Sequence, residues 1–216
     1  MIRVYITTVS EAVSDGAEKR LSEYRRAKLP RKNGAVSLAA GLLLDYALRG
    51  YGLYECDMEY RENEHGKPFF KNCTDIKFNL SHSGEYAVCA ISDDGESSAG
   101  IGIDAEKNRD TKNALKIAER YFTPAEYEYV KNSGDTKTTF FKLWTRKESL
   151  LKAIGTGISG GLGAYEVLCD EITVGDTKFC FSQIRGYENM SITLCAEEKE
   201  FDVKFVKNTD FKKISP

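Results

Sequence analysis

Two acidic residues lie two positions apart in the segment Gly100-Ile-Gly-Ile-Asp-Ala-Glu106. If this segment is a strand, Asp104 and Glu106 share one face, while Ile101 and Ile103 point to the other face. Carboxylates on one face, with glycines making room beside them, are the oxygen ligands that Mg²⁺ prefers. Taken alone, the pair fits better an edge strand whose solvated face happens to carry two acids.

A third acid falls in a segment whose apolar spacing predicts a helix over 138–154, ended by Gly155. Glu148 lies four residues after Trp144, beside the predicted buried stripe, and Lys152 follows one turn later. A carboxylate beside an apolar face needs a metal or a cation as its partner. An ordinary Glu–Lys pair on a helix surface has the same spacing, so both interpretations stay open.

Several residues suit the binding of an anion. Ser81, His82 and Ser83 precede Gly84 at the predicted end of a strand, where hydroxyls, an imidazole and backbone N–H groups can surround an anion. A lone histidine in a turn is also commonly just solvated. Basic residues gather upstream, where each one is consistent with a solvated surface charge and the group together suits a phosphate. They are Lys67, in His65-Gly-Lys-Pro68, and Arg25, Arg26, Lys28, Arg31 and Lys32.

The composition excludes several function classes. The 216 residues carry 31 Lys and Arg against 33 Asp and Glu, a net charge of -2, which gives no global basic field for a nucleic acid. No apolar run approaches the roughly 18 residues of a membrane span, and the first residues lack the plan of a signal peptide. The six cysteines show no CxxC pair or zinc-like spacing. We therefore expect a cytoplasmic protein with free thiols and no nucleic-acid or membrane partner.

Hydrophobic periodicity predicts the elements that must position these residues. We expect an α+β fold with helices and strands in both halves. A short internal sequence similarity favours two halves of similar plan: residues 78–81 resemble 179–182, and Cys89-Ala90 recurs as Cys195-Ala196. Such short matches also arise by chance. Strands are predicted at 3–9, 57–61, 76–80, 86–92 and 100–106, helices at 17–28, 35–49, 115–122, 123–130 (with a Thr123–Glu126 capping box) and 138–154, and a strand-rich stretch from 165 to 205 before a polar tail.

The order of the motifs resembles that of the Sfp-type 4'-phosphopantetheinyl transferases. The motifs are G-K-P before residue 69, F-N-L-S-H-S-G from Phe78, G-I-D-A-E from Gly102 and W-x-x-K-E-S-x-x-K-x-x-G from Trp144. The resemblance covers residues 65–157, and the flanking regions match by plan only. It implies two similar subdomains related by a pseudo-two-fold, with the active site between them. Residues 1–104 are expected to hold the coenzyme A phosphate and adenosine contacts, and 105–216 the Glu148–Lys152 helix and the carrier-protein contacts.

The resemblance implies a role for each matching residue. Asp104, Glu106 and Glu148 match Mg²⁺ ligands, and Mn²⁺ accepts the same oxygens. Lys152 and Asp104 match residues at the metal-bound pyrophosphate of coenzyme A. The remaining matches are Ser81 and His82 at the phosphates, Lys67 and Pro68 at the adenosine end, and, more loosely because Pro30 and Ser37 disturb the family pattern, Lys28, Arg31 and Lys32 at the 3'-phosphate. Ala105 stands where the family more often has a bulkier apolar residue.

The implied reaction moves the phosphopantetheine arm of coenzyme A, a substrate, onto a serine of an apo acyl- or peptidyl-carrier protein and releases 3',5'-ADP. Glu148 is the expected base for the serine, with Lys152 and His82 supplying positive charge. Tyr121, Phe122 and the 123–130 helix are expected to meet the carrier, although Tyr127 and Tyr129 also suit half-buried positions. We expect a monomer, because two fused halves let one chain complete the site.

Three other interpretations differ from this one, and the ordered set of motifs disfavours the first of them, a purely structural α+β domain. An acyl-coenzyme A N-acetyltransferase needs a Q/R-x-x-G-x-G/A turn, which the sequence lacks. A non-catalytic coenzyme A-binding protein of the same fold would be favoured by loss of one acid, and all three acids are present. The sequence leaves open the identity of the base, the choice between Mg²⁺ and Mn²⁺, and whether the carrier serves fatty acid, polyketide or nonribosomal peptide synthesis.

Overall fold

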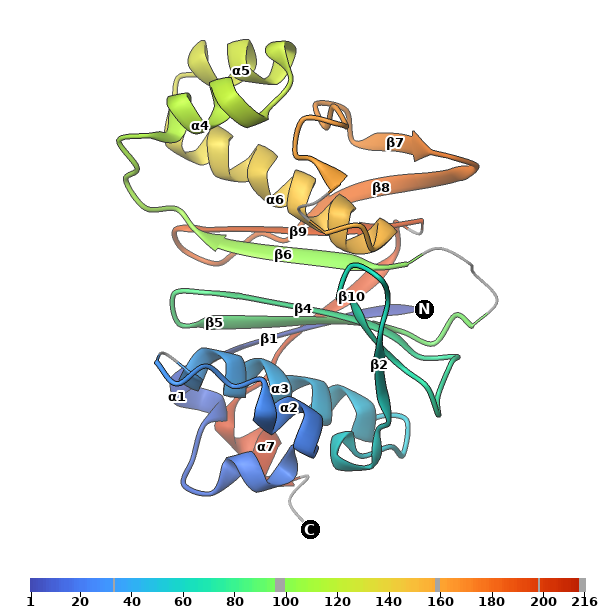
Figure 1. Ribbon diagram of the computed structural model, residues 1–216. Coiled ribbons are helices and arrows are strands. Elements are labelled where there is room, and N and C mark those ends of the chain that lie inside the picture. Colours follow the sequence, from blue (N-terminus) through green and yellow to red (C-terminus); the bar gives the residue numbers. More distant parts are fainter. Residues whose placement is uncertain (33, 96–99, 158–159, 198, 214–216) are drawn as a thin grey trace. The chain divides into compact units, whose positions relative to one another are not determined.

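The computed structural model describes residues 1–32, 34–95, 100–157, 160–197 and 199–213, and it contains two compact units (Figure 1). Unit 1 comprises Met1–Asn63, Pro68–Ser98 and Glu200–Pro216, and unit 2 comprises Glu64–Lys67 and Ala99–Lys199. This division differs from the expected one at residue 104 in three respects. Residues 64–67 belong to unit 2. Strand β6 (Gly102–Lys107) lies wholly in unit 2, and the last residues of the chain return to unit 1.

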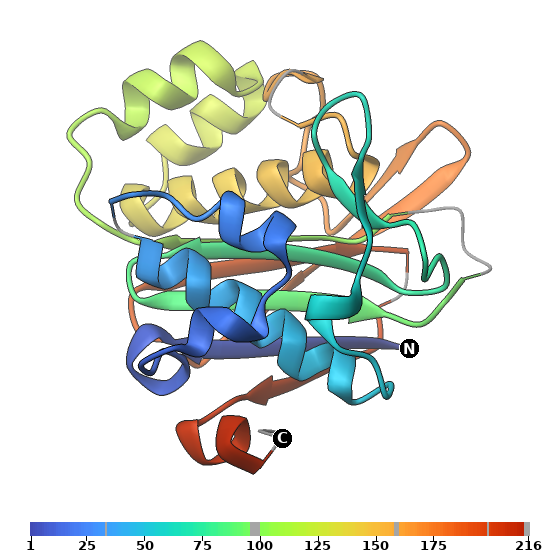
Figure 2. The same cartoon turned by 60° about the horizontal axis from the view of Figure 1, so that its bottom comes forward.

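Unit 1 is a four-stranded sheet with a long helix across one face (Figure 2). The strand order is β10-β1-β5-β4, with β10 parallel to β1 and the other pairs antiparallel. Helix α3 (Gly34–Arg49) packs its leucines on this sheet, and Leu42, Leu43 and Leu44 are fully buried. The strands are β1 (Ile2–Thr8), β4 (Lys77–Ser83), β5 (Tyr86–Ser92) and β10 (Phe201–Phe205).

The smaller elements of unit 1 depart most from expectation. The helix predicted over 17–28 is wrong, because the chain breaks at Ser22, whose amide and hydroxyl donate to Glu55 at 2.5 and 2.8 Å. Ser22 then caps a separate short helix, α2, by accepting from the Arg25 amide. These elements are α1 (Val9–Ala12), the 3-10 helices η1 (Ala17–Arg20) and η2 (Glu55–Asp57), α2 (Glu23–Ala27), the hairpin β2 (Tyr60–Glu62) and β3 (Pro68–Phe70), and α7 (Asn208–Lys213).

Unit 2 is an antiparallel sheet of order β6-β9-β8-β7, covered by helix α6 (Thr136–Ile154). Helices α4 and α5 lie on the side of α6 away from the sheet (Figure 1). The capping box of Thr123 and Glu126 is confirmed at the start of α5, and Gly155 ends α6 in the left-handed conformation. The remaining elements are α4 (Ala114–Tyr121), α5 (Pro124–Lys131), β7 (Glu171–Val174), β8 (Thr177–Gln183) and β9 (Met190–Ala196).

The two units share an order of strand pairing. In unit 1, β1 pairs with β5, which pairs with β4; in unit 2, β6 pairs with β9, which pairs with β8. The internal sequence similarity falls at matching places in these pairs, since Leu80 lies opposite Cys89 and Phe181 lies opposite Cys195. The structure thus has the expected mixed α+β architecture with two sheet-containing halves, and the pseudo-two-fold relation stays a prediction.

The cysteines and helices agree with the limits set by composition. All six cysteines are free, and Cys89, Cys180 and Cys195 are buried. Across the described residues, the helices lack the combination of length and apolar character needed to span a bilayer.

Candidate active site

Asp104 and Lys152 meet where strand β6 faces helix α6. Asp104 is only 5% exposed, and its Oδ1 accepts a hydrogen bond from Lys152 Nζ at 2.6 Å. The same ammonium donates to the backbone oxygen of Ile103 at 3.1 Å. A buried carboxylate held by an ammonium and a strand carbonyl fixes both side chains, so the structure joins two residues that lie far apart in the sequence.

Glu148 and Glu106 belong to the same electrostatic cluster. The pKa of Glu148 is raised to about 6, mainly by burial and also by the negative charges of Asp104 and Glu106, while Lys152 opposes the shift. Three carboxylates that influence one another around a single lysine leave an excess of negative charge. The arrangement therefore favours a cation at this place.

Whether a divalent metal fits here depends on how the carboxylates of Asp104, Glu106 and Glu148 are arranged and charged. In the part of the chain that the structure describes, no three His, Cys, Asp or Glu side chains form a ready-made metal site. The carboxylate of Asp104 is instead turned to Lys152. Carboxylate oxygens under mutual repulsion nonetheless suit a hard cation such as Mg²⁺, which relieves the repulsion and keeps ligand positions for phosphate oxygens.

The glycines of this strand have a different role from the predicted one. A Cβ on Gly102 would overlap the carbonyl oxygen of Ser149, and a Cβ on Gly100 would overlap that of Ala153. The glycines therefore allow α6 to approach β6 backbone to backbone, whereas the sequence suggested that they clear space for a cation. This close approach brings Glu148 and Lys152 over Asp104.

Ser81 and His82 are separated by the alternation of β4. His82 is exposed and shares a hydrogen bond of 3.1 Å with Ser37 Oγ, near the start of α3. Ser81 is 9% exposed and points to the opposite face of the strand, because successive side chains alternate. Of the two, only His82 lines the cavity described next.

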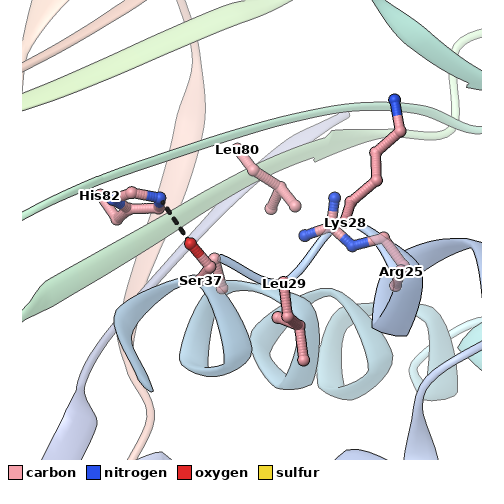
Figure 3. A pocket seen from close by; sticks show the side chains of 7 residues that line it. Arg25, Lys28, Leu29, Ser37, Leu80 and His82 are labelled. Atoms are coloured by element: carbon pink, nitrogen blue, oxygen red, sulfur yellow. Dashed lines mark hydrogen bonds between the residues drawn. The ribbon is translucent and has the colours of Figure 1, made fainter. Parts of the chain in front are cut away.

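A cavity of about 220 Å³ lies between α2, α3 and β4 in unit 1. Figure 3 shows the Arg25 guanidinium reaching toward Leu80 and His82, while the Lys28 ammonium points away from them. Two basic side chains, an imidazole and a hydroxyl around one hollow give it the character of an anion site. Its lining consists of Arg25, Lys28, Leu29, Ser37, Ala40, Leu80 and His82.

The three loosely predicted 3'-phosphate residues differ in placement. Lys28 lines the cavity but is paired with Glu62, whose carboxylate also accepts from Tyr24 Oη at 2.6 Å. Hydrogen bonding to Glu62 raises the pKa of Lys28, and the reciprocal bond lowers that of Glu62. Arg31 and Lys32 are exposed and do not line the cavity, and Asn33 beside them lies outside the described residues.

Arg25 is the functional candidate that sequence reasoning left unassigned. It lies in the basic cluster, but the direction of its side chain depends on α2. This helix of five residues is separated from the preceding turn by the Ser22–Glu55 hydrogen bonds. The composition of the segment gives a signal for the cluster as a whole and none for Arg25 in particular.

Lys67 and Pro68 lie at the boundary of the two units along the chain. Lys67 belongs to unit 2, where its Nζ donates to the backbone oxygens of Ile101 and Ala153, each at 3.2 Å. Pro68 begins β3 in unit 1. The Lys67 ammonium thus bonds to a backbone oxygen next to β6 and to another on α6, where these two elements lie close together.

A second cavity of about 130 Å³ lies beside Glu106 in unit 2. Trp144 and Phe140, predicted as part of a buried stripe, form its apolar wall, and Phe140 itself is only 3% exposed. A charged end and an apolar wall suit a ligand that carries both kinds of group. The lining is Glu106, Arg109, Thr111, Ile117, Phe140, Phe141 and Trp144.

The expected carrier surface contains both exposed and buried aromatics. Tyr121 and Tyr129 are 42% and 50% exposed, whereas Phe122 is buried and stacks on Phe140. Tyr127 packs partly against the core of unit 2. Of the two α5 tyrosines, Tyr129 is therefore exposed enough to contact a partner, whereas Tyr127 is half-buried in the core of unit 2.

Comparison with known proteins gives a consistent result. A family model described as the 4'-phosphopantetheinyl transferase superfamily matches residues 100–205. A 4'-phosphopantetheinyl transferase of Bacillus subtilis is 31% identical over 221 residues, which span 93% of this chain and 94% of that protein. The transferase gsp of Aneurinibacillus migulanus is 39% identical over 59% of this chain and 51% of its own length. Sfp of Bacillus subtilis strain 168 is 36% identical over 55% of this chain and 51% of its own length.

Proposed function

This chain belongs to the 4'-phosphopantetheinyl transferase superfamily, and we propose that it moves the phosphopantetheine arm of coenzyme A onto a serine of an apo carrier protein, in a Mg²⁺-dependent reaction that releases 3',5'-ADP. The activity itself follows from similarity to a 4'-phosphopantetheinyl transferase across 93% of the chain. The residue roles and the reaction course are the proposal. The observation that carries it is the cluster of Asp104, Glu106, Glu148 and Lys152 on β6 and α6.

The acidic cluster is proposed to hold Mg²⁺, with Mn²⁺ accepted by the same oxygens. Asp104, Glu106 and Glu148 would be the ligands, and the bound metal would neutralise negative charge on the phosphates. The pKa of Glu148 is raised mainly by burial and also by the charges of Asp104 and Glu106, and this repulsion among the three carboxylates supports the assignment. Lys152, held against Asp104, is proposed to place its positive charge beside the pyrophosphate.

The basic cavity in unit 1 is proposed to bind phosphate oxygens of coenzyme A. Arg25, Lys28 and His82 line it, and a guanidinium and an imidazole together suit an anionic oxygen. Arg25 replaces Arg31 and Lys32 in this proposal, because those two are exposed outside the lining. For Ser81, a contact with a coenzyme A phosphate is proposed from the motif resemblance alone, because Ser81 does not line this cavity. Lys67 and Pro68 keep their place at the adenosine end on the same ground.

The transfer step is a displacement at phosphorus. The carrier serine oxygen forms a bond to the phosphate that bears the pantetheine arm, and the bond from that phosphorus to the oxygen bridging to 3',5'-ADP breaks. The serine proton passes to a base, for which Glu148 is the candidate because its pKa is raised to about 6. Lys152 and His82 are proposed to donate hydrogen bonds to phosphate oxygens, so that developing negative charge is matched.

The carrier is proposed to dock on the α4–α5 side of unit 2. Tyr121 and Tyr129 provide exposed aromatic area there, and Leu115 on α4 is 38% exposed. Aromatic side chains are enriched at the cores of protein interfaces. The cavity beside Glu106, with Trp144 in its wall, is proposed to receive part of the pantetheine arm, because it adjoins the acidic cluster.

Incubation with coenzyme A, Mg²⁺ and an apo carrier protein tests this function directly. The carrier should gain the mass of one phosphopantetheine group, and a carrier whose acceptor serine is replaced by alanine should gain none. A panel of carriers from fatty acid, polyketide and nonribosomal peptide synthesis identifies the partner. Coenzyme A binding without any mass gain across the panel would instead favour a non-catalytic coenzyme A-binding protein.

A further inference from the structure

Strand β6 and the last turns of α6 form an unusually close backbone seam. We define the seam as Gly100, Gly102, Ser149 and Ala153, where a Cβ on either glycine would overlap a carbonyl oxygen of the helix. Such an approach has no room for side chains between the two elements. Their separation must therefore be maintained by groups at the border of the seam.

The Lys67 side chain bridges the two elements of this seam. Its Nζ donates to the carbonyl oxygen of Ile101, next to β6, and to that of Ala153, on α6, at 3.2 Å in both cases. Ala153 lies in the last turn of the helix, where carbonyl groups have no partner within the helix and carry partial negative charge. An ammonium suits this position both as a hydrogen-bond donor and as a positive charge.

Lys152 makes the corresponding bridge two residues further along the strand. Its Nζ donates to the Ile103 carbonyl at 3.1 Å and to Asp104 Oδ1 at 2.6 Å. The two lysines therefore use alternate carbonyls of one strand. Because Ala153 is covalently joined to Lys152, any shift of α6 at the Lys67 bridge moves the Lys152–Asp104 pair with it.

We propose that Lys67 is a positioning residue, whose ammonium fixes β6 against the end of α6 so that Lys152, Glu148 and Asp104 are held in register for transfer. Its side chain then does not contact coenzyme A, and any contact at the adenosine end comes from the backbone there. This assignment rests on the proposed function for its link to transfer, while the bridge itself is independent of that function. It departs from the role that the motif resemblance implies for Lys67.

The first test separates positioning from ligand contact with Lys67→Met. Loading kinetics should show kcat lowered about tenfold or more and the Mg²⁺ concentration for half-maximal rate raised, since misplacing catalytic groups slows the reaction. Calorimetry with 3',5'-ADP, which carries the adenosine end alone, should give a dissociation constant within about twofold of the wild type. Lys67→Arg, which keeps donors for both carbonyls, should restore most of kcat.

The matched control is Lys71→Met, because Lys71 is exposed on the hairpin and pairs with Glu59 at 2.8 Å. It should change none of these values. The opposite result for Lys67→Met, with kcat unchanged and 3',5'-ADP bound about tenfold more weakly, would overturn the proposal and assign the side chain to the ligand.

The second test needs neither metal nor substrate. Hydrogen exchange of the ligand-free protein should be faster over residues 149–156 and 100–106 in Lys67→Met and unchanged in Lys71→Met, because the seam opens more often. Equal exchange in Lys67→Met and wild type would contradict the bridge. If Lys67→Met does not fold, Lys67→Gln carries the same tests, since it stays polar but removes the ammonium and its shorter side chain does not span both carbonyls. A wild type that loads no carrier would defeat the proposed function, while the exchange result would still decide the role of Lys67.

Discussion

Units 1 and 2 each place a long helix on a four-stranded sheet and share an order of strand pairing, yet the two helices bury different kinds of side chain. Helix α3 presents fully buried Leu42, Leu43 and Leu44 to its sheet. Helix α6 also buries Arg146 and Lys147, which are 3% and 2% exposed. In unit 1 the helix therefore supplies an apolar core beside a basic cavity. In unit 2 the helix binds the 162–170 segment and Glu126 through these two buried cations, and its Lys152 binds Asp104.

The first strand of each unit explains part of this difference. Tyr5 of β1 packs against the apolar core that contains α3, so side chains separate the helix from the strand. At the corresponding strand β6, Gly102 lets the backbones approach, and Asp104 takes the next position on the same face. A close approach of helix and strand is what allows a carboxylate of one to meet a lysine of the other.

Each unit also contains a fully buried carboxylate, and the largest predicted effect comes from comparing the two. Glu126 is paired at 2.6 Å with Lys147, and both side chains are at most 1% exposed. Lys147→Met should lower the free energy of unfolding by about 3–5 kcal/mol, because Glu126 is left buried without its cation. In unit 1, Arg49→Met should cost about 1 kcal/mol, because Arg20 still binds Asp45. Urea denaturation of both variants measures this, and equal losses would show that the two carboxylates are equivalent.

Loss of the acidic cluster should stop chemistry while the fold is kept. Asp104→Asn retains the shape and an acceptor for Lys152 but removes one negative charge from the cluster. Carrier loading should fall about 100- to 1000-fold in kcat/KM, a loss typical of removing one charge-stabilising group. Asp202→Asn, on exposed strand β10 of unit 1, is the control and should load normally. Near-normal loading by Asp104→Asn would remove Asp104 from the metal set.

The basic cavity of unit 1 should affect binding more than chemistry. Arg25→Ala should raise KM for coenzyme A about 10- to 100-fold through loss of a charge-assisted hydrogen bond, with a smaller change in kcat. Lys32→Ala, an exposed neighbour outside the cavity, should leave KM unchanged. Steady-state kinetics at fixed ionic strength decides between them. Equal effects of both substitutions would indicate a general charge effect in place of a built anion site.

The smallest expected effect is a pH-dependent change in stability at Glu148. Its pKa in the folded protein is raised to about 6, so ionising this carboxyl above pH 6 lowers the free energy of unfolding. Below the ordinary pKa of a glutamate the carboxyl is protonated in both states, and this loss of stability disappears. Metal-free Glu148→Gln should therefore unfold at a higher temperature than wild type at pH 8, by roughly 2–4 °C per kcal/mol of relieved repulsion, and at the same temperature at pH 4. Mg²⁺ should raise the wild-type midpoint more than that of the variant. Calorimetric scans with Mg²⁺ and with EDTA test both statements.

The sequence predicts the elements whose signals are local. The capped helix α5 and helices α3 and α6 follow from periodicity, Thr123, Gly50 and Gly155, because caps and stop residues act within a few positions. The break at Ser22 is invisible locally, since it depends on Glu55 more than 30 residues away. The short strand β3 and helix α7 likewise depend on tertiary packing, as Phe70 and Phe211 in the unit 1 core indicate.

The candidate site divides in the same way. The motif resemblance places Asp104 and Lys152 at one site without predicting a bond between them, and in the structure they meet at 2.6 Å. The separation of Ser81 from His82 follows from strand alternation once the strand is known to continue to Ser83. The roles of Arg25 and of the glycines depend on how separate elements approach, which no local pattern encodes.

The division of work between the two units is tested most directly by calorimetry of coenzyme A binding with and without Mg²⁺. Arg25→Ala should weaken binding in both conditions, because the cavity in unit 1 is proposed to bind phosphate oxygens without metal. Asp104→Asn should bind like the wild type without Mg²⁺ and lose only the gain in affinity that Mg²⁺ provides. If Asp104→Asn weakened Mg²⁺-free binding as much as Arg25→Ala, and kept the full gain from Mg²⁺, the assignment of anion binding to unit 1 and metal binding to unit 2 would be contradicted.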